Sequence, residues 1–176
     1  MQTTDWKFDF SKLPRWENHD LIPFIYDDFT EISQSDMLCC IYSVAEVSMC
    51  NYEGFLAIIK NKEKPELFLN VSENMTFCDN ISVSPKGNLI FLQPNIKKNN
   101  SIKRPILIID TEKSAFAYFD TNNVNCCYKI IQIHESVYKV EADAYQKKSD
   151  KRLRALSRKK IRINRLKWRN LTEFHS

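Results

Sequence analysis

The feature that most constrains the fold is a series of short apolar segments that begins near residue 38. They are rich in Ile, Val, Leu, Phe, Tyr and Cys, and clusters of Asn, Lys, Glu, Pro and Gly separate them. Short β-branched and aromatic runs between turn-forming residues are typical of antiparallel β-structure. We therefore predict a mainly β fold, an antiparallel meander or open sandwich, with strands over 39–48, 55–61, 66–71, 80–84, 88–93, 105–110, 115–120, 126–133 and 136–141.

Two of these segments, 89–92 and 106–109, are apolar at every position. A strand with one solvent face alternates apolar and polar residues, so an uninterrupted run indicates burial on both faces. We expect other parts of the chain to cover both sides of these strands.

The strands also show a weak repeat. Those predicted near Cys39, Asn80 and Cys126 begin at spacings of roughly 40 and 46 residues, as in four-stranded propeller blades. The sequence of 84–88 followed by 89–92, and later 106–111, resembles the strand-turn-strand pattern of such blades. Because about 100 residues make only two or three blades, the resemblance implies an open sheet or sandwich with propeller-blade-like repeats.

Charge divides the chain into two regions. Residues 1–146 contain 14 Lys and Arg against 20 Asp and Glu, a net charge of −6, whereas residues 147–176 contain 12 against 2, a net charge of +10. Opposite net charges on two parts of a chain indicate what kind of partner each part attracts. We predict an acidic β-rich domain over 1–146 and a basic C-terminal helical appendage over 147–176, packed on that domain or extending from it.

A helix is predicted within residues 144–160, which lack Pro and Gly and contain many good helix formers. Ser149 or Asp150 is positioned to cap an internal start. Leu153 and Leu156 lie on one face of this helix, and we expect the helix to break near residue 160.

The sequence excludes several classes of function. Two glycines are too few for a P-loop or a dinucleotide-binding fingerprint, and no hydrolase motif is present. Three histidines and six cysteines lack metal-ligand spacing. We predict a cytoplasmic protein that is not an enzyme, with no catalytic residue, metal, cofactor or membrane partner, and with free cysteines that behave as small buried hydrophobes.

A protein-binding surface is predicted near the N-terminus, where aromatic and acidic residues alternate. Aromatic side chains supply rigid contact area, and carboxylates select a basic partner. The alternative is that the aromatic residues belong to the core. The predicted partner-binding residues are Trp16, Glu17, Asp20, Tyr26, Asp27, Asp28, Glu31 and Asp36.

In overall character the chain resembles the immunity proteins of bacterial contact-dependent growth-inhibition systems. The likeness lies in a small, β-rich, Lys-, Asn- and Ile-rich chain with few glycines, an acidic body and no catalytic signature. It rests on no diagnostic motif, so it assigns no residue. The resemblance implies a non-enzymatic inhibitor that binds and neutralises a cognate basic toxin, such as a nuclease.

The basic C-terminal region supports an alternative function, binding of RNA or the ribosome. Clustered Lys and Arg residues contact phosphates, and an interleaved aromatic residue can stack on a base. The competing interpretation is that Leu153 and Leu156 dock on the sheet while the basic residues merely face water. The predicted nucleic-acid-binding residues are Arg152, Arg158, Lys160, Arg165 and Trp168.

Overall fold

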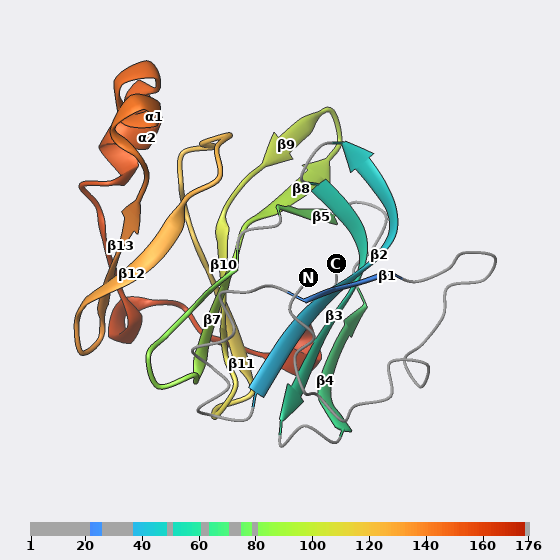
Figure 1. Ribbon diagram of the computed structural model, residues 1–176. Coiled ribbons are helices and arrows are strands. Elements are labelled where there is room, and N and C mark those ends of the chain that lie inside the picture. The colour runs from blue at the N-terminus through green and yellow to red at the C-terminus, as the bar shows by residue number, and fades with distance from the viewer. Residues whose placement is uncertain are drawn as a thin grey trace.

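The computed structural model describes residues 22–25, 37–48, 51–60, 64–70, 75–78 and 81–174, with side chains at 75, 76 and 81–174. Its strands form three antiparallel sheets (Figure 1), which confirms the mainly β prediction. The predicted partner-binding residues lie outside the described part of the chain.

The first sheet has seven strands and contains the N-terminal half of the described chain. Its order is β1-β2-β3-β5-β8-β9, and β4 also pairs with β3. The strands are β1 (Ile22–Ile25), β2 (Met37–Ser48), β3 (Asn51–Lys60), β4 (Lys64–Asn70), β5 (Met75–Cys78), β8 (Pro94–Lys98) and β9 (Ser101–Lys103).

The other two sheets have five and three strands. The five-stranded order is β15-β11-β10-β7-β6, and the three-stranded order is β12-β13-β14. Figure 1 shows β7, β10 and β11 between β12–β13 on one side and β2–β4 on the other. The strands are β6 (Ser82–Val83), β7 (Leu89–Leu92), β10 (Ile106–Asp110), β11 (Ala115–Phe119), β12 (Lys129–His134), β13 (Val137–Glu141), β14 (Lys160–Arg162) and β15 (Arg169–Asn170).

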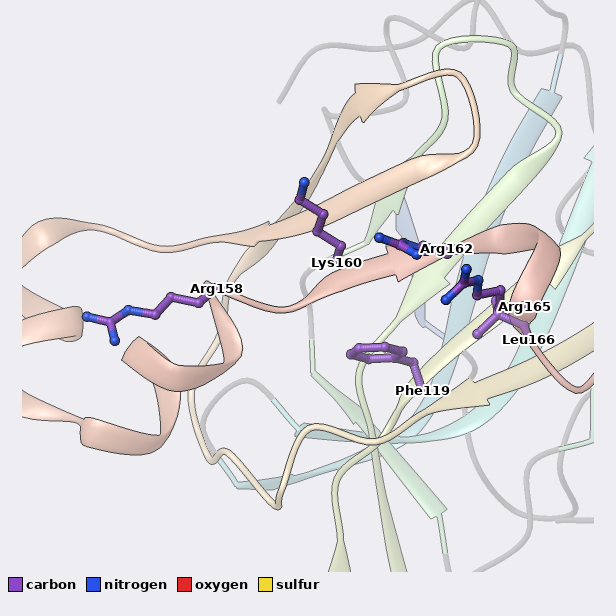
Figure 2. A pocket seen from close by; sticks show the side chains of 6 residues that line it. All are labelled: Phe119, Arg158, Lys160, Arg162, Arg165 and Leu166. Atoms are coloured by element: carbon purple, nitrogen blue, oxygen red, sulfur yellow. The ribbon is translucent and has the colours of Figure 1, made fainter.

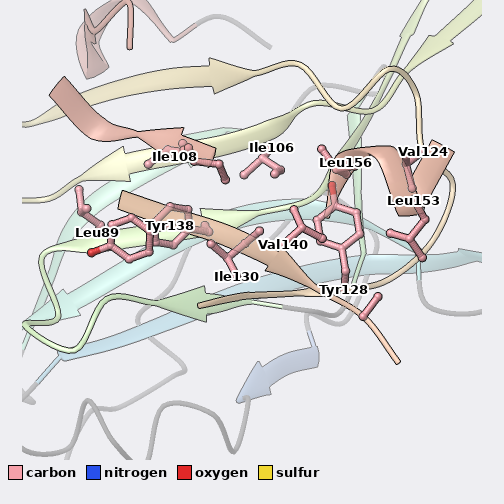
Figure 3. Packing of buried hydrophobic residues seen from close by; sticks show 13 residues of the cluster. Leu89, Ile106, Ile108, Val124, Tyr128, Ile130, Tyr138, Val140, Leu153 and Leu156 are labelled. Atoms are coloured by element: carbon pink, nitrogen blue, oxygen red, sulfur yellow. The ribbon is translucent and has the colours of Figure 1, made fainter. Parts of the chain in front are cut away.

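The core surrounds β7 and β10, and every residue of these two strands is buried. This confirms that both apolar runs are covered on both faces. On one face, Phe91 of β7 packs against Tyr138 of β13 with ring centroids 4.8 Å apart. The cluster on that face comprises Leu89, Phe91, Ile106, Ile108, Val124, Tyr128, Ile130, Tyr138, Val140, Ala142, Leu153, Leu156 and Ile161 (Figure 3).

The turn between β6 and β7 forms as the sequence predicts. Gly87 has φ 72°, a left-handed conformation that is accessible to glycine without steric cost. Its N–H donates to the carbonyl of Ser84 at 2.8 Å. The blade-like repeat that this segment suggests stays a prediction.

The basic C-terminal segment differs from the predicted helical appendage. Within the predicted helix 144–160 the structure has two short helices, α1 (Ala144–Ser149) and α2 (Lys151–Leu156). Of the two candidate caps it is Asp150 whose carboxylate accepts from Arg152 N and Leu153 N. The remaining elements are η3 (Ile163–Arg165), η4 (Leu171–Glu173) and two strands, of which β14 pairs with β13 and β15 pairs with β11. The segment is therefore built into two sheets.

Other differences arise where local sequence is a weak signal. The predicted strand 126–133 begins only at Lys129, after a turn in which Asn122 and Asn123 have positive φ. The hairpin of β8 and β9 is absent from the predicted strands because its Lys- and Asn-rich residues do not alternate apolar with polar. Asn99, with φ 54°, forms its turn.

Candidate functional site

A hollow lined by four basic residues lies where α2, β14, η3 and the end of β11 meet (Figure 2). It is open to solvent and has a volume of about 630 Å³. We call it the basic hollow, and its lining residues are Phe119, Arg158, Lys160, Arg162, Arg165 and Leu166.

The local sequence of β14 places two of the cations. Ile161 is fully buried, whereas Lys160 and Arg162 are exposed. Side chains alternate across a strand, so burial of Ile161 directs both flanking basic side chains to the opposite, outer face. The burial of one isoleucine thus orients two of the four positive charges.

The other two cations come from the turns on either side of β14. Arg158 follows α2, and its N–H donates to the carbonyl of Ala155 at 3.2 Å. Arg165 ends η3. In Figure 2 the guanidinium groups of Arg162 and Arg165 lie near the Phe119 ring, whereas Arg158 extends away from it.

Phe119 and Leu166 form the apolar part of the lining. Both are partly buried and pack against the core cluster, which holds them in place. None of the four cations, all of them in the described region, makes a cation–π contact with the Phe119 ring. The accessible part of this ring therefore remains available for stacking with a ligand.

The electrostatic character of the basic hollow follows from the absence of counter-charges among the described residues. Within residues 81–174, no carboxylate lies at ion-pair distance from any of its four cations. Neighbouring basic residues differ: Lys113 pairs with Asp110 at 3.0 Å, and Lys159 Nζ lies 3.1 Å from the Asn122 amide oxygen, in the amide orientation that also donates to Asp120. Four like charges in one hollow repel one another, so an anion bound there is stabilised.

The structure brings together three of the predicted nucleic-acid-binding residues, Arg158, Lys160 and Arg165. Arg152 is exposed on α2, outside the lining. Trp168 is also outside it: the ring packs against the core cluster, and its Nε1 donates to the carbonyl of Ile163 at 3.1 Å. Trp168 therefore has a structural role in this arrangement.

Phe119, Arg162 and Leu166 are the lining residues outside the predicted set. Arg162 belongs to the same basic run as the predicted residues. Leu166 is flanked by basic residues, but no pattern separates it from other leucines. Phe119 lies 39 positions before Arg158, in a strand of a different sheet, so no local signal connects them. The pairing of β11 with β15, and the packing of Phe119 and Leu166 on the same core cluster, bring the two parts of the chain together.

One described cysteine differs from the prediction that the cysteines are free thiols. Cys126 is a free thiol, but Cys127 is disulfide-bonded, so the expectation of free cysteines is wrong for Cys127. Disulfide formation depends on which sulfur atoms the fold brings within reach, which spacing alone does not reveal. Burial, followed by the nearby carboxylates of Asp150 and Asp143, raises the pKa of the Cys126 thiol. This thiol is therefore a weaker nucleophile at neutral pH than an exposed cysteine.

No protein-family model, curated protein or solved structure matches the chain. In the part of the chain that the structure describes, no three His, Cys, Asp or Glu side chains gather as a possible metal site. Likewise, none of the described helices is long and apolar enough to cross a membrane.

Proposed function

We propose that the protein binds single-stranded RNA through its basic C-terminal segment, with the basic hollow at the centre of the binding surface. The observation that carries this proposal is a group of four cations, with no carboxylate partner within residues 81–174, beside an accessible aromatic ring. Phosphate contacts supply most of the affinity of a protein for nucleic acid, and bases stack on aromatic side chains.

The size and chemistry of the basic hollow support a single strand as ligand. Its volume lies within the range of about 300–1,000 Å³ that is usual for small ligands, which suits one unstacked nucleotide rather than a duplex. Arginine guanidinium groups bind phosphate oxygens in a bidentate manner, and lysine adds a mobile point charge. Among the described residues, the lining contains no carboxylate, histidine or thiol, which supports binding rather than turnover.

The test is a titration of a labelled single-stranded RNA, followed by fluorescence anisotropy at two salt concentrations. Four phosphate contacts imply a slope of about −2.8 in log affinity against log salt, so affinity is expected to fall about 50-fold between 50 and 200 mM. RNA binding that is absent, or insensitive to salt, would overturn the proposal.

Two variants distinguish RNA binding at the basic hollow from RNA binding by positive charge elsewhere on the surface. Arg162→Ala combined with Arg165→Ala is expected to weaken binding by about tenfold or more, because both groups line the hollow and neither has a carboxylate partner within residues 81–174. Lys97→Ala combined with Lys98→Ala is the matched control, since both lysines are exposed on β8 and lie outside the lining. Equal weakening in both variants would contradict a binding site at the hollow.

Inhibition of a basic toxin stays a prediction from the sequence. The residues that carry it, from Trp16 to Asp36, lie outside the described part of the chain. The described hollow has the opposite charge to the acidic surface that such an inhibitor would need, so it supports RNA binding instead.

A further inference from the structure

We infer that the basic hollow receives the 5′ end of the RNA strand, and that it recognises a terminal polyphosphate rather than an internal nucleotide. This inference rests on the proposed function and specifies its ligand. It follows from the number of cations, their arrangement around Phe119 and the size of the space they enclose.

The positive charge of the hollow can be compared with the negative charge of each kind of ligand. An internal nucleotide brings one phosphate charge, and its neighbours lie further along the strand. A 5′-triphosphate carries about four negative charges on one nucleotide, because each inner phosphate contributes one and the terminal phosphate close to two. The lining residues Arg158, Lys160, Arg162 and Arg165 supply four positive charges. A 5′-triphosphate therefore neutralises the hollow, whereas one internal nucleotide leaves most of its charge unbalanced.

The basic side chains of the hollow are arranged as donors to phosphate oxygens. Arg162 and Arg165 line the same hollow as Phe119, and Figure 2 draws both above the ring, with Lys160 on the same face of β14 as Arg162. Two adjacent guanidinium groups can bind oxygens of neighbouring phosphates in a polyphosphate chain. The first base can stack on Phe119, which makes no cation–π contact with these described residues.

Basic residues outside the hollow indicate a path for the rest of the RNA strand. Arg158 extends away from the ring in Figure 2, towards the side of α2. Exposed basic residues Lys151, Arg152 and Arg154 lie on that helix. These residues offer further phosphate contacts outside the hollow, as expected if the strand begins in the hollow and continues over α2.

The experiment compares three RNAs of one sequence, about 12 nucleotides long, labelled at the 3′ end. They carry a 5′-hydroxyl, a 5′-monophosphate or a 5′-triphosphate. The affinity of the full-length protein is expected to rise in this order, with about tenfold or more between the first and the last. Equal affinity for all three would overturn the inference while leaving RNA binding intact, whereas absence of all binding would overturn the proposed function itself.

Variants test whether the preference originates in the hollow. Arg162→Ala with Arg165→Ala is expected to reduce the ratio of triphosphate to hydroxyl affinity to about twofold or less, and Arg152→Ala is expected to preserve it. All these arginines are exposed, so the variants should melt at the same temperature as the parent protein. A preference that survives in the double variant, with unchanged melting, would place the 5′ end elsewhere.

A free nucleoside triphosphate shares the chemistry of the strand terminus, so a competition arm distinguishes the two. Unlabelled ATP or GTP is expected to displace the triphosphate RNA only at concentrations at least about tenfold above the RNA, because it lacks the contacts on α2. Displacement at an equal concentration would assign the hollow to free nucleotides and overturn the inference of a strand end.

Discussion

At the scale of single residues, Asp110 shows how a buried charge is stabilised in this fold. It ends β10 with only 1% of its surface exposed. One carboxylate oxygen accepts from the backbone N–H groups of Glu112 and Lys113 at 3.1 and 3.0 Å, and the other accepts from Lys113 Nζ at 3.0 Å. The carboxylate therefore organises the turn between β10 and β11.

Replacing this carboxylate should destabilise the protein more than replacing its lysine partner. Asp110→Ala leaves two backbone donors without an acceptor, so the free energy of unfolding is expected to fall by about 2–3 kcal/mol. Lys113→Ala is the control, because the lysine side chain is 68% exposed and its ion pair is screened, for a loss below about 1 kcal/mol. Urea unfolding measures both, and equal losses would show that the turn does not depend on the carboxylate.

At the scale of elements, the two short helices differ in what they bury. Asp143 caps α1, which buries no residue, and Asp150 caps α2, which buries Leu153 and Leu156. Six-residue helices are too short to be stable alone, so tertiary packing must hold them. We therefore expect α2 to unfold with the core and α1 to open independently.

The two caps provide a matched test of this difference. Asp150→Ala is expected to lower the free energy of unfolding by about 1 kcal/mol, because the N–H groups of Arg152 and Leu153 lose their acceptor. Asp143→Ala removes the acceptor of Gln146 N and should change global stability by less than about 0.5 kcal/mol. Chemical denaturation followed by Trp fluorescence measures both, and a larger loss for Asp143→Ala would contradict the independence of α1.

At the scale of the whole molecule, the basic segment is a structural part of the β fold. It contributes β14 to one sheet and β15 to another, and it buries Leu153, Leu156, Ile161 and Leu171. The interpretation in which Leu153 and Leu156 dock on the sheet is therefore confirmed for those two residues. The same packing positions the basic side chains that line the hollow.

Deletion of residues 147–176 is expected to abolish folding. Truncating one buried Leu or Ile costs about 2–5 kcal/mol, and a domain has only about 5–15 kcal/mol of stability, so the loss of four such residues exceeds it. Circular dichroism during heating should show no cooperative transition for the shortened chain. Ile161→Val, which costs about 1 kcal/mol, is the control that should still fold. A cooperative transition in the shortened chain would show that the segment is dispensable.

The local features of this fold could be predicted from the sequence. Uninterrupted apolar runs at 89–92 and 106–109 indicated strands buried on both faces, and Ser149 or Asp150 indicated an internal helix start, which the structure places at Asp150. These features depend on residues within a few positions of one another, so periodicity and propensity are sufficient to predict them. Lys160 and Arg165 were likewise predicted to bind nucleic acid because the charge lies in one run.

The tertiary structure decided which of these residues share a site. Residues 160–162 alternate exposed, buried, exposed over only three positions, too few to distinguish a strand from the end of a helix, and pairing with β13 makes them a strand. Phe119 lines the hollow although it lies in another sheet. Trp168 was predicted to bind nucleic acid, but its ring packs on the core instead. Local preferences act over a few residues, whereas the basic hollow depends on contacts between distant segments, and these form only when the whole core packs.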